Sequence, residues 1–342
     1  MLLLRPDEIK DLMDLREVID TVEGAFAELG RNPLINAPRR RIYTGGTRAT
    51  VHQGASPDLD VTGLRTHCER LELRADVQQY LHSAPGVSVL YRISDGSLVA
   101  IIVGAGITVE GADLRSAAVS AVGTRHLMKP GAAAVGLLGT GTQARTHLLA
   151  LKEVMPLQAV RVYGRDPERR RAFCAELARR LGVEVRPEDS PRGAVEGMDV
   201  IVTATNSNVP VFDGRWLTPG AHVTSIVADD VGLVKAGLLP HIRRELDDET
   251  IRRADVIVAL SREQAVLDEQ GDLYEPVQAG VIRWEQVHEL GEVLTGRAPG
   301  RATPQQITLF KNNGGQGVSD VAIAARLYEK ARVRGLGLEV PV

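Results

Sequence analysis

The sequence predicts an α/β protein built on a doubly wound parallel sheet, accompanied by a second α+β domain. Apolar, β-branched runs alternate with helical segments in the second half of the chain, and a glycine-rich turn joins one of these runs to a helix. Hairpin signals occur in the first half. Because 342 residues exceed what one hydrophobic core usually supports, we expect two domains, with the nucleotide-type domain running from about residue 130 to 300.

The first half of the chain is expected to begin with a helix and to continue with hairpins. The opening apolar residues recur at helical spacing, after a proline and two acidic residues that suit a first helical turn. The dipeptides Gly45-Gly46 and Asp95-Gly96 favour tight hairpin turns. The predicted elements are a helix at 6–30, strand-like segments within 36–62, strands at 86–91 and 98–103, and a buried helix at 114–128.

Strands and helices alternate in the second half of the chain. This order predicts βαβ units with right-handed crossovers, and therefore a parallel sheet covered on both faces. The predicted strands are 133–138, 159–163, 183–185, 199–203, 221–227 and 255–260, and the predicted helices are 142–154, 167–181 and 318–334.

Composition and charge exclude several classes of protein. The 41 Lys and Arg residues against 44 Asp and Glu give a net charge of −3, which argues against a nucleic-acid binder. Two cysteines and eight histidines without ligand spacing give no reason to expect a disulfide framework or a metal site. The N-terminus is charged too early for a signal peptide and no long apolar stretch follows, so a soluble, cytoplasmic protein without a membrane partner is expected.

Glycine is used unusually often, with 34 residues, and it concentrates at 104–111, 136–141 and 314–317. The second concentration contains the pattern G-x-G-x-x-A between a predicted strand and a predicted helix, the accepted variant of the dinucleotide fingerprint of Rossmann-type domains. In this pattern one glycine allows the turn, the next lets a pyrophosphate approach the backbone, and the alanine packs the helix on the sheet. The predicted cofactor-binding residues are Gly139, Thr140, Gly141, Thr142, Gln143 and Ala144.

The choice between the two dinucleotides depends on the end of the next strand. Arg165 is placed where it could bind the 2′-phosphate of NADP, which favours NADP over NAD. Asp166 keeps NAD open, because an acidic residue in this region can bind the ribose 2′-hydroxyl. Alternatively, Arg165 stacks on the adenine and the arginines at 169–171 form a solvated helix face.

Several motifs together resemble the ornithine cyclodeaminase/μ-crystallin family over nearly the whole chain. They are LRSAA at 114–118, GLLGTGTQA at 136–144, VTAT at 202–205, TLFK at 308–311 and the later Asp320. The resemblance implies a Rossmann dinucleotide-binding domain at 130–304 and a substrate-binding and dimerisation domain made of 1–129 plus 305–342. It also implies a homodimer and NAD(P)-dependent chemistry at the C–N bond of an amino or imino acid.

The resemblance also indicates which residues bind the substrate carboxylate. Arg115 matches the arginine of the family's LRTAA motif and is the expected carboxylate clamp, since a guanidinium binds a carboxylate with two parallel hydrogen bonds. The alternative is a structural salt bridge at a helix start. Arg65 stands where the family usually has a lysine, so it keeps the charge but cannot form a Schiff base. Arg40 or Arg41 matches another substrate arginine, and Arg41 is taken as the candidate.

Three further residues are expected at the carboxyl edge of the sheet, where doubly wound folds bind ligands. By resemblance Asp229 is the acid/base that exchanges protons with the reacting nitrogen, with capping of its own loop as the alternative. Thr205 and Lys311 are expected near the nicotinamide. The segment after Lys311, with two asparagines and three glycines, departs from the family and either reshapes the pocket or forms a flexible loop.

These features together predict an NAD(P)-dependent oxidoreductase, with Asp229, Arg115 and Arg65 as its catalytic residues. The expected reaction is reduction of an imino acid or ketimine, or dehydrogenation of an amino acid. One alternative is an ornithine-type cyclodeaminase that releases ammonia and recycles its cofactor within a turnover. Another is a non-catalytic NADPH-binding protein like μ-crystallin.

Overall fold

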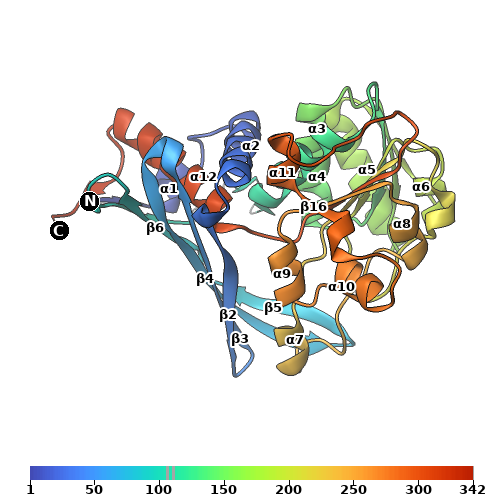
Figure 1. Ribbon diagram of the computed structural model, residues 1–342, viewed down its shortest axis with the longest axis horizontal. Helices are drawn as coiled ribbons and strands as arrows, with labels where there is room; N and C mark the ends of the chain where they lie inside the picture. Colours follow the sequence, from blue (N-terminus) through green and yellow to red (C-terminus); the bar gives the residue numbers. More distant parts are fainter. Residues whose placement is uncertain (105–107, 110–111, 342) are drawn as a thin grey trace. The chain divides into compact units, whose positions relative to one another are not determined.

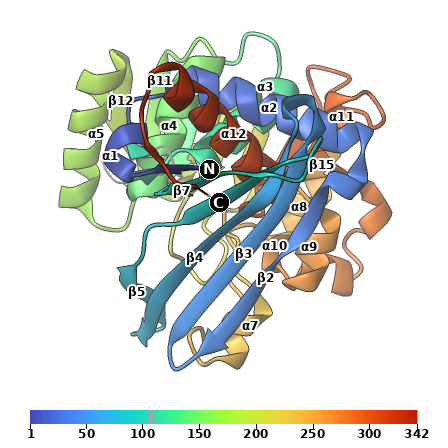
Figure 2. The same cartoon turned by 90° about the vertical axis from the view of Figure 1, so that its left-hand side faces the viewer.

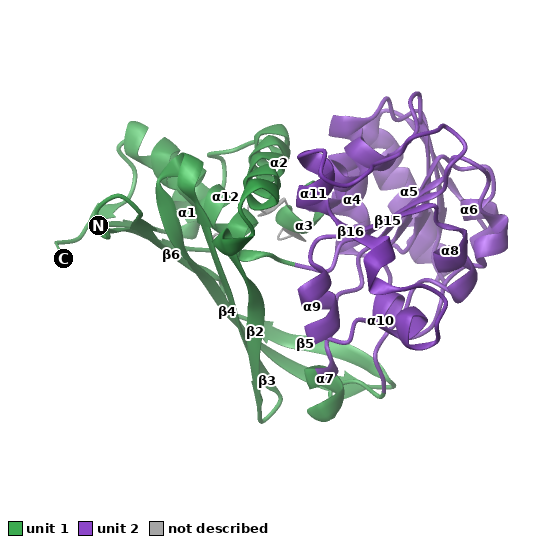
Figure 3. Ribbon diagram, viewed as in Figure 1, with its two compact units in different colours: residues 1–118, 232–240, 315–342 green, residues 119–231, 241–314 purple. Residues whose placement is uncertain are grey.

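The computed structural model describes residues 1–104, 108–109 and 112–341, and shows two compact units. Unit 1 comprises residues 1–118, 232–240 and 315–342, and unit 2 comprises 119–231 and 241–314 (Figure 3). The interior of the first glycine concentration, at 105–107 and 110–111, lies outside the described residues. The predicted functional division after residues 129 and 304 stays a prediction.

Unit 1 is a mainly antiparallel sheet with helices α2 and α12 packed on one face (Figures 1 and 2). Its strand order is β18-β1-β7-β6-β4-β3-β2, with β5 paired to the far half of β4 and with β1 parallel to β7. The strands are β1 Leu2–Leu4, β2 Asn36–Thr44, β3 Thr47–Ser56, β4 Val61–Arg74, β5 Val77–Ser83, β6 Val87–Arg92, β7 Leu98–Val103 and β18 Leu338–Glu339, with a separate short pair of β8 Thr108–Val109 and β9 Ala112–Asp113. The helices are α1 Pro6–Ile9, α2 Leu15–Arg31 and α12 Gly317–Val333.

Helix α12 lies very close to the sheet at its first turn. A side chain on Gly54 of β3 would overlap the backbone of Gly317 and Val318, and one on Gly63 of β4 would overlap the carbonyl of Val89. Glycine at position 54 is therefore needed for this approach of α12, whereas glycine at position 63 allows β4 to lie close to β6. As a result the first turn of α12 lies directly over β3.

The hairpins of unit 1 confirm some predictions and correct others. The turn at Gly45-Gly46 is confirmed, with positive φ at both residues. A single helix over 6–30 is wrong, because Asp14 accepts a hydrogen bond from the Glu17 amide and starts a separate helix, α2. The β4–β5 hairpin was not predicted, since its turn residues Ala75 and Asp76 have positive φ without any glycine.

Unit 2 is a parallel sheet with the order β12-β11-β10-β13-β14-β17-β15-β16, so the predicted doubly wound sheet is confirmed. Two separate groups of buried apolar residues cover it, one containing Leu138 and Ile201 and the other Leu137 and Val202. The strands are β10 Ala134–Leu138, β11 Ala159–Tyr163, β12 Glu184–Pro187, β13 Val200–Thr203, β14 His222–Ser225, β15 Val256–Ala259, β16 Val287–Glu289 and β17 Thr308–Lys311. The helices are α4 Thr142–Val154, α5 Pro167–Leu181, α6 Pro191–Val195, α8 Asp248–Arg253, α9 Arg262–Leu267, α10 Gly271–Gln278 and α11 Leu290–Leu294, and the chain passes between the units within α3 Arg115–Leu127 and α7 Val231–Lys235.

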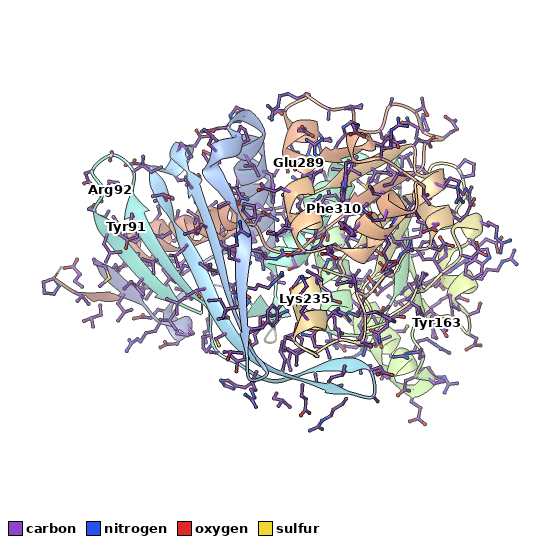
Figure 4. All side chains as sticks on the ribbon, turned by 60° about the horizontal axis from the view of Figure 1, so that its bottom comes forward. Tyr91, Arg92, Tyr163, Lys235, Glu289 and Phe310 are labelled. Carbon is purple, nitrogen blue, oxygen red and sulfur yellow. The ribbon has the colours of Figure 1, made fainter. Side chains whose placement is uncertain are left out.

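Strand β17 is last in the sequence of unit 2 but lies inside its sheet, between β14 and β15. The sequence motif at 308–311 was noted without being predicted as a strand. Phe310 of this strand, labelled in Figure 4, is fully buried, and a side chain on Gly123 would overlap its ring. The insertion brings the end of β17 next to the ends of β14 and β15, which matters for the site below.

Among the described residues, no helix has both the length and the hydropathy of a membrane span.

Candidate active site

The glycine-rich turn of unit 2 has the backbone geometry that the fingerprint requires. Gly139 follows β10 with a φ of 122°, and its amide donates to the carbonyl of Tyr163 at 2.9 Å. A side chain at this position would overlap the carbonyl of Ala204, which follows β13. Only glycine fits both the φ angle and this approach.

The start of helix α4 leaves room for an anion. Gly141 is its N-cap residue, no side chain caps the first turn, and a Cβ on Gly141 would meet nothing within 4 Å. The first amides of a helix need acceptors and favour negative charge, so a pyrophosphate fits this position. Ala144 is fully buried under the helix, and the Thr140 side chain lies against Gly164. Thr142 and Gln143 form the first turn of the helix.

The residues after β11 bear on the choice of dinucleotide. Asp166 is the N-cap of α5, and its carboxylate accepts from the amides of Glu168 at 2.9 Å and Arg169 at 3.0 Å. Arg165 is exposed and donates to the Asn206 side chain at 3.3 Å. Arg170 is buried beside Tyr163 and donates to the Gly164 carbonyl. The acidic residue is thus engaged in capping a helix, whereas the Arg165 guanidinium lies at the surface.

Lys311 lies at the end of β17 in a buried ion pair. Its ammonium contacts Asp272 of α10 at 2.8 Å, the Ser225 hydroxyl at 3.1 Å and the carbonyl of Val227. These three acceptors match the three protons of the ammonium group. Lys311 and Asp272 are both fully buried, so the pair joins the ends of β14 and β17 to helix α10.

Asp272 also connects this pair to the loop before α8. One of its oxygens accepts from the Ser225 hydroxyl at 2.5 Å, and the other accepts from the amides of Glu245 and Leu246. Burial acts to raise the pKa of Asp272, but the neighbouring Lys311 ammonium outweighs it and lowers that pKa.

Thr205, two residues after β13, is held by a second buried carboxylate. Its amide and its hydroxyl both donate to one oxygen of Glu245, at 2.6 Å and 2.7 Å. Burial, followed by the charge of Asp272, raises the pKa of Glu245 despite these hydrogen bonds. Glu245 has no exposed surface, and its other oxygen has no hydrogen-bond partner in the described part of the chain.

Asp229 lies after β14 and is 7% exposed. The Arg243 guanidinium binds it with both arms of its fork, through Nε and through Nη2 at 2.9 Å. Arg243 and Glu245 belong to the same loop, so one short segment fixes the side chains that follow β13 and β14.

The asparagine segment after Lys311 is hydrogen-bonded and buried. Asn313 accepts from the amides of Leu260 and Ser261 and donates to the Ser261 carbonyl. Asn312 donates to the Ser120 hydroxyl, which also contacts His147 of α4 at 2.9 Å. For these two asparagines, the expectation of a flexible loop is wrong.

Unit 1 places a row of polar side chains on the face of the sheet that α12 covers. Cross-strand register puts Arg65 of β4 opposite His52 of β3 and His67 opposite Thr50, and Thr50 is in turn opposite Arg41 of β2. Side chains directly opposite each other share one face of a sheet, so strands β2, β3 and β4 together present these groups.

Arg115 and His52 meet at one carboxylate from α12. Asp320 is 2.9 Å from His52 Nδ1 and 3.1 Å from Arg115 Nε, and all three side chains are at most 11% exposed. Burial acts to raise the pKa of Asp320, but Arg115 and His52 hold it well below its ordinary value. Burial lowers the pKa of His52 to about 4, so the imidazole is neutral at pH 7. The salt bridge given as the alternative for Arg115 is present in the structure.

Arg39 of β2 lies near the same polar face of the sheet. Arg39 is buried and donates to the Gly315 carbonyl at 3.2 Å, whereas Arg40 is exposed on the other face and Arg41 is half-buried. Burial and the charge of Arg65 lower the pKa of His67 to about 3. Because successive side chains of β2 point to opposite faces of the sheet, Arg41 lies on the polar face and Arg40 does not. The sequence alone did not distinguish these two candidates.

The structure thus gathers the predicted site residues into two sets. Unit 1 holds Arg41, Arg65 and Arg115, and unit 2 holds the glycine-rich turn, Arg165, Thr205, Asp229 and Lys311. Sequence reasoning missed five residues: His52, Arg243, Glu245 and Asp272 were not singled out, and Asp320 was noted only as part of a motif. Their partners lie between 14 residues, for Arg243, and more than 200 residues, for Asp320, away in the sequence, which is beyond the reach of helix or strand periodicity. No group of three His, Cys, Asp or Glu side chains placed to hold a metal occurs in the part of the chain that the structure describes.

The chain was compared with known proteins. The sequence profile of the ornithine cyclodeaminase/mu-crystallin family matches residues 4–335. The chain is 34% identical to the ketimine reductase mu-crystallin of Rattus norvegicus over 337 residues, which is 95% of this chain and 96% of that protein. It is 29% identical to a Delta(1)-pyrroline-2-carboxylate reductase of Bacillus thuringiensis over 343 residues, 99% of each.

A solved structure shares the fold over the same extent. The Thermococcus litoralis Delta(1)-pyrroline-2-carboxylate reductase in complex with NADH and L-proline superposes with a TM-score of 0.82 at 29% identity, covering 99% of this chain and 100% of that one. The fold prediction and the predicted resemblance are both confirmed by these findings.

Proposed function

This chain belongs to the ornithine cyclodeaminase/mu-crystallin family, and we propose that it is an NAD(P)H-dependent reductase of a cyclic imino acid. The observation that carries the proposal is the turn from β10 into α4, in a chain that matches an NADH- and proline-bound reductase from end to end. A dinucleotide fits this turn because Gly139 gives the backbone path and the uncapped amides of α4 have space before them. When bound, the reduced nicotinamide supplies a hydride, which adds to the carbon of the C=N bond.

Unit 1 supplies the groups that bind the substrate carboxylate. Arg115 acts as the clamp, and Asp320 orients it by pairing with Nε. Arg65 and Arg41 add positive charge from the same face of the sheet. Arg115 has a fixed carboxylate partner at its Nε, so its loss should impair substrate binding.

Unit 2 supplies the acid/base group. Asp229 passes one proton to the imine nitrogen and, as the carboxylate, stabilises the iminium charge that results, so that the iminium needs only a hydride to become the amine. Arg243 holds this carboxylate by both oxygens and so fixes its direction. Thr205 and Lys311 are placed by this proposal near the nicotinamide. Lys311 acts indirectly, by holding the ends of β14 and β17 together with α10.

We assign the functional domains as 1–129 plus 305–342 for substrate binding and dimerisation, and 130–304 for the dinucleotide.

The partner in the proposed homodimer is a second copy packed on the open face of the unit 1 sheet. Leu3, Ile101, Val89 and Leu64 are in register there, and all are partly exposed. An apolar row of this kind favours association. Val89→Asp should give a monomer by light scattering, and an unchanged mass would exclude this face. The cytoplasmic location stays a prediction.

The reaction is tested by mixing the purified protein with NADPH or NADH and Delta(1)-pyrroline-2-carboxylate, its six-membered homologue, pyruvate with ammonia, or L-ornithine. Loss of nicotinamide absorbance that depends on a cyclic imino acid supports the proposal. Ammonia release from ornithine without net cofactor change would replace it with cyclodeamination. Cofactor binding without turnover of any substrate would replace it with a binding protein.

A further inference from the structure

Glu245 and Asp272 form a buried pair of carboxylates at the carboxyl edge of the unit 2 sheet, next to one lysine. Neither carboxylate has exposed surface, and the Glu245 backbone amide donates to Asp272 at 2.8 Å. Lys311 contacts Asp272 at 2.8 Å and supplies the single positive charge of the group. Two buried carboxylates sharing one ammonium carry one uncompensated negative charge, which is costly without water.

The hydrogen bonds decide which carboxylate is charged. Both oxygens of Asp272 accept hydrogen bonds, from Ser225 and Lys311 on one side and from two backbone amides on the other. Only one oxygen of Glu245 accepts hydrogen bonds, both of them from Thr205. The other is buried and has no partner among the described residues. A proton on that second oxygen removes the excess charge and leaves every described hydrogen bond in place.

We propose that Glu245 is held as a neutral carboxylic acid and is a positioning residue for Thr205, and through it for the nicotinamide end of the cofactor. The charged groups that face it are Asp272 from α10 and Lys311 from β17. The neighbours Arg243 and Arg244 on its own loop are bound to Asp229 and to Asp248. The role in cofactor binding rests on the proposed function, whereas the neutral form of Glu245 does not.

The protonation state of the Glu245 carboxyl group is tested by infrared spectroscopy. The difference spectrum between the wild type and Glu245→Gln should lose the C=O stretch of a protonated carboxyl group. Loss of the two carboxylate bands instead would overturn the proposal. Glu196→Gln is the matched control, since that exposed residue pairs with Arg192 at the surface and should show loss of carboxylate bands.

The positioning role is tested by fluorescence titration with NADPH and NADH. Glu245→Ala removes both hydrogen bonds to Thr205 and should weaken the affinity about tenfold, and Glu245→Gln should restore most of it. As the pH is raised, ionisation of the wild-type residue should weaken binding, and the glutamine variant should lose this dependence. Equal losses in both variants with an unchanged pH profile would mean a structural role only. A wild type that binds neither nucleotide would refute the proposed function, while the infrared result would still decide the form of Glu245.

Discussion

Each unit contains a buried ion-pair cluster, and the two clusters differ in what surrounds the charges. In unit 2 the cluster is centred on Lys311 and Asp272, and the three protons of the ammonium are taken by three acceptors of the protein. In unit 1 the Asp320 carboxylate contacts Arg115 of α3 and His52 of β3, and the charge of Arg65 on β4 also acts on it. The first cluster joins strand ends and has no proton left for a ligand, whereas the second is suited to bind an anion. Burial of an ion pair alone therefore does not identify a binding site.

Acid should destabilise both units and have the largest effect. Burial lowers the pKa of His52 and His147 to about 4, and of His67 and His222 to about 3, from an ordinary value of 6.5. Between these values the unfolded chain binds more protons than the folded one. The free energy of unfolding therefore falls as the pH drops, by on the order of 2 kcal/mol per fully buried histidine at pH 5. Urea unfolding at about pH 7 and pH 5 measures this, and equal midpoints would contradict it.

Lys311→Met should be the most damaging substitution, because it leaves Asp272 buried without its countercharge. We expect a loss of about 3–5 kcal/mol in the free energy of unfolding, measured in urea. Lys330→Met is the matched control, since its partner Glu17 is 41% exposed and such surface pairs contribute about 0–1 kcal/mol. Equal stability of the two variants would remove the distinction between a structural and a binding cluster.

Arg115→Lys should spare the fold and impair catalysis. The lysine keeps the charge but loses the planar fork, so kcat/KM for the imino acid should fall about 100-fold, mainly through KM. Nicotinamide affinity, measured by fluorescence, should stay within about twofold of the wild type. A variant that kept kcat/KM but unfolded more easily would mean that Arg115 serves only its ion pair with Asp320.

Arg165→Ala should have the smallest effect of these changes, and it should alter only the affinity for the cofactor. Removing the surface guanidinium should weaken NADPH about tenfold and leave NADH nearly unchanged, since only NADPH carries a 2′-phosphate. Arg169→Ala, on the exposed face of α5, is the control. Equal losses for both nucleotides would favour stacking of Arg165 on the adenine.

Local patterns predicted unit 2 well because its signals are contiguous in sequence. Helices α4 and α5 and strand β11 have the predicted bounds, and the turn at Gly139 lies where the fingerprint placed it. Strand β17 was missed because its four residues follow a long irregular segment. Only the strand pairing shows that these residues belong to the sheet of unit 2. In unit 1 the β4–β5 hairpin was missed because its turn, at Ala75 and Asp76, lacks glycine.

The candidate site was predicted where single residues match a motif and missed where partners are remote. Arg115 and Asp229 were identified in this way, but their partners Asp320 and Arg243 were not recognised as such. The contact of His52 with Asp320 joins β3 to α12, which are far apart in the chain. Such a pair follows from the close approach of α12 to Gly54, and no spacing in the sequence encodes it.

The composition of unit 1 from separate segments has a consequence for synthesis on the ribosome. All strands of its sheet except β18 are translated within the first 118 residues, but α12, which covers one face and provides Asp320, begins only at Gly317. At about 5–20 residues per second, translation from residue 118 to the start of α12 takes roughly 10–40 s. During that interval its arginines lack the Asp320 carboxylate, and the sheet residues that α12 will cover are exposed. Nascent unit 1 should therefore be a chaperone client, and it should acquire its anion-binding face only after α12 has been translated.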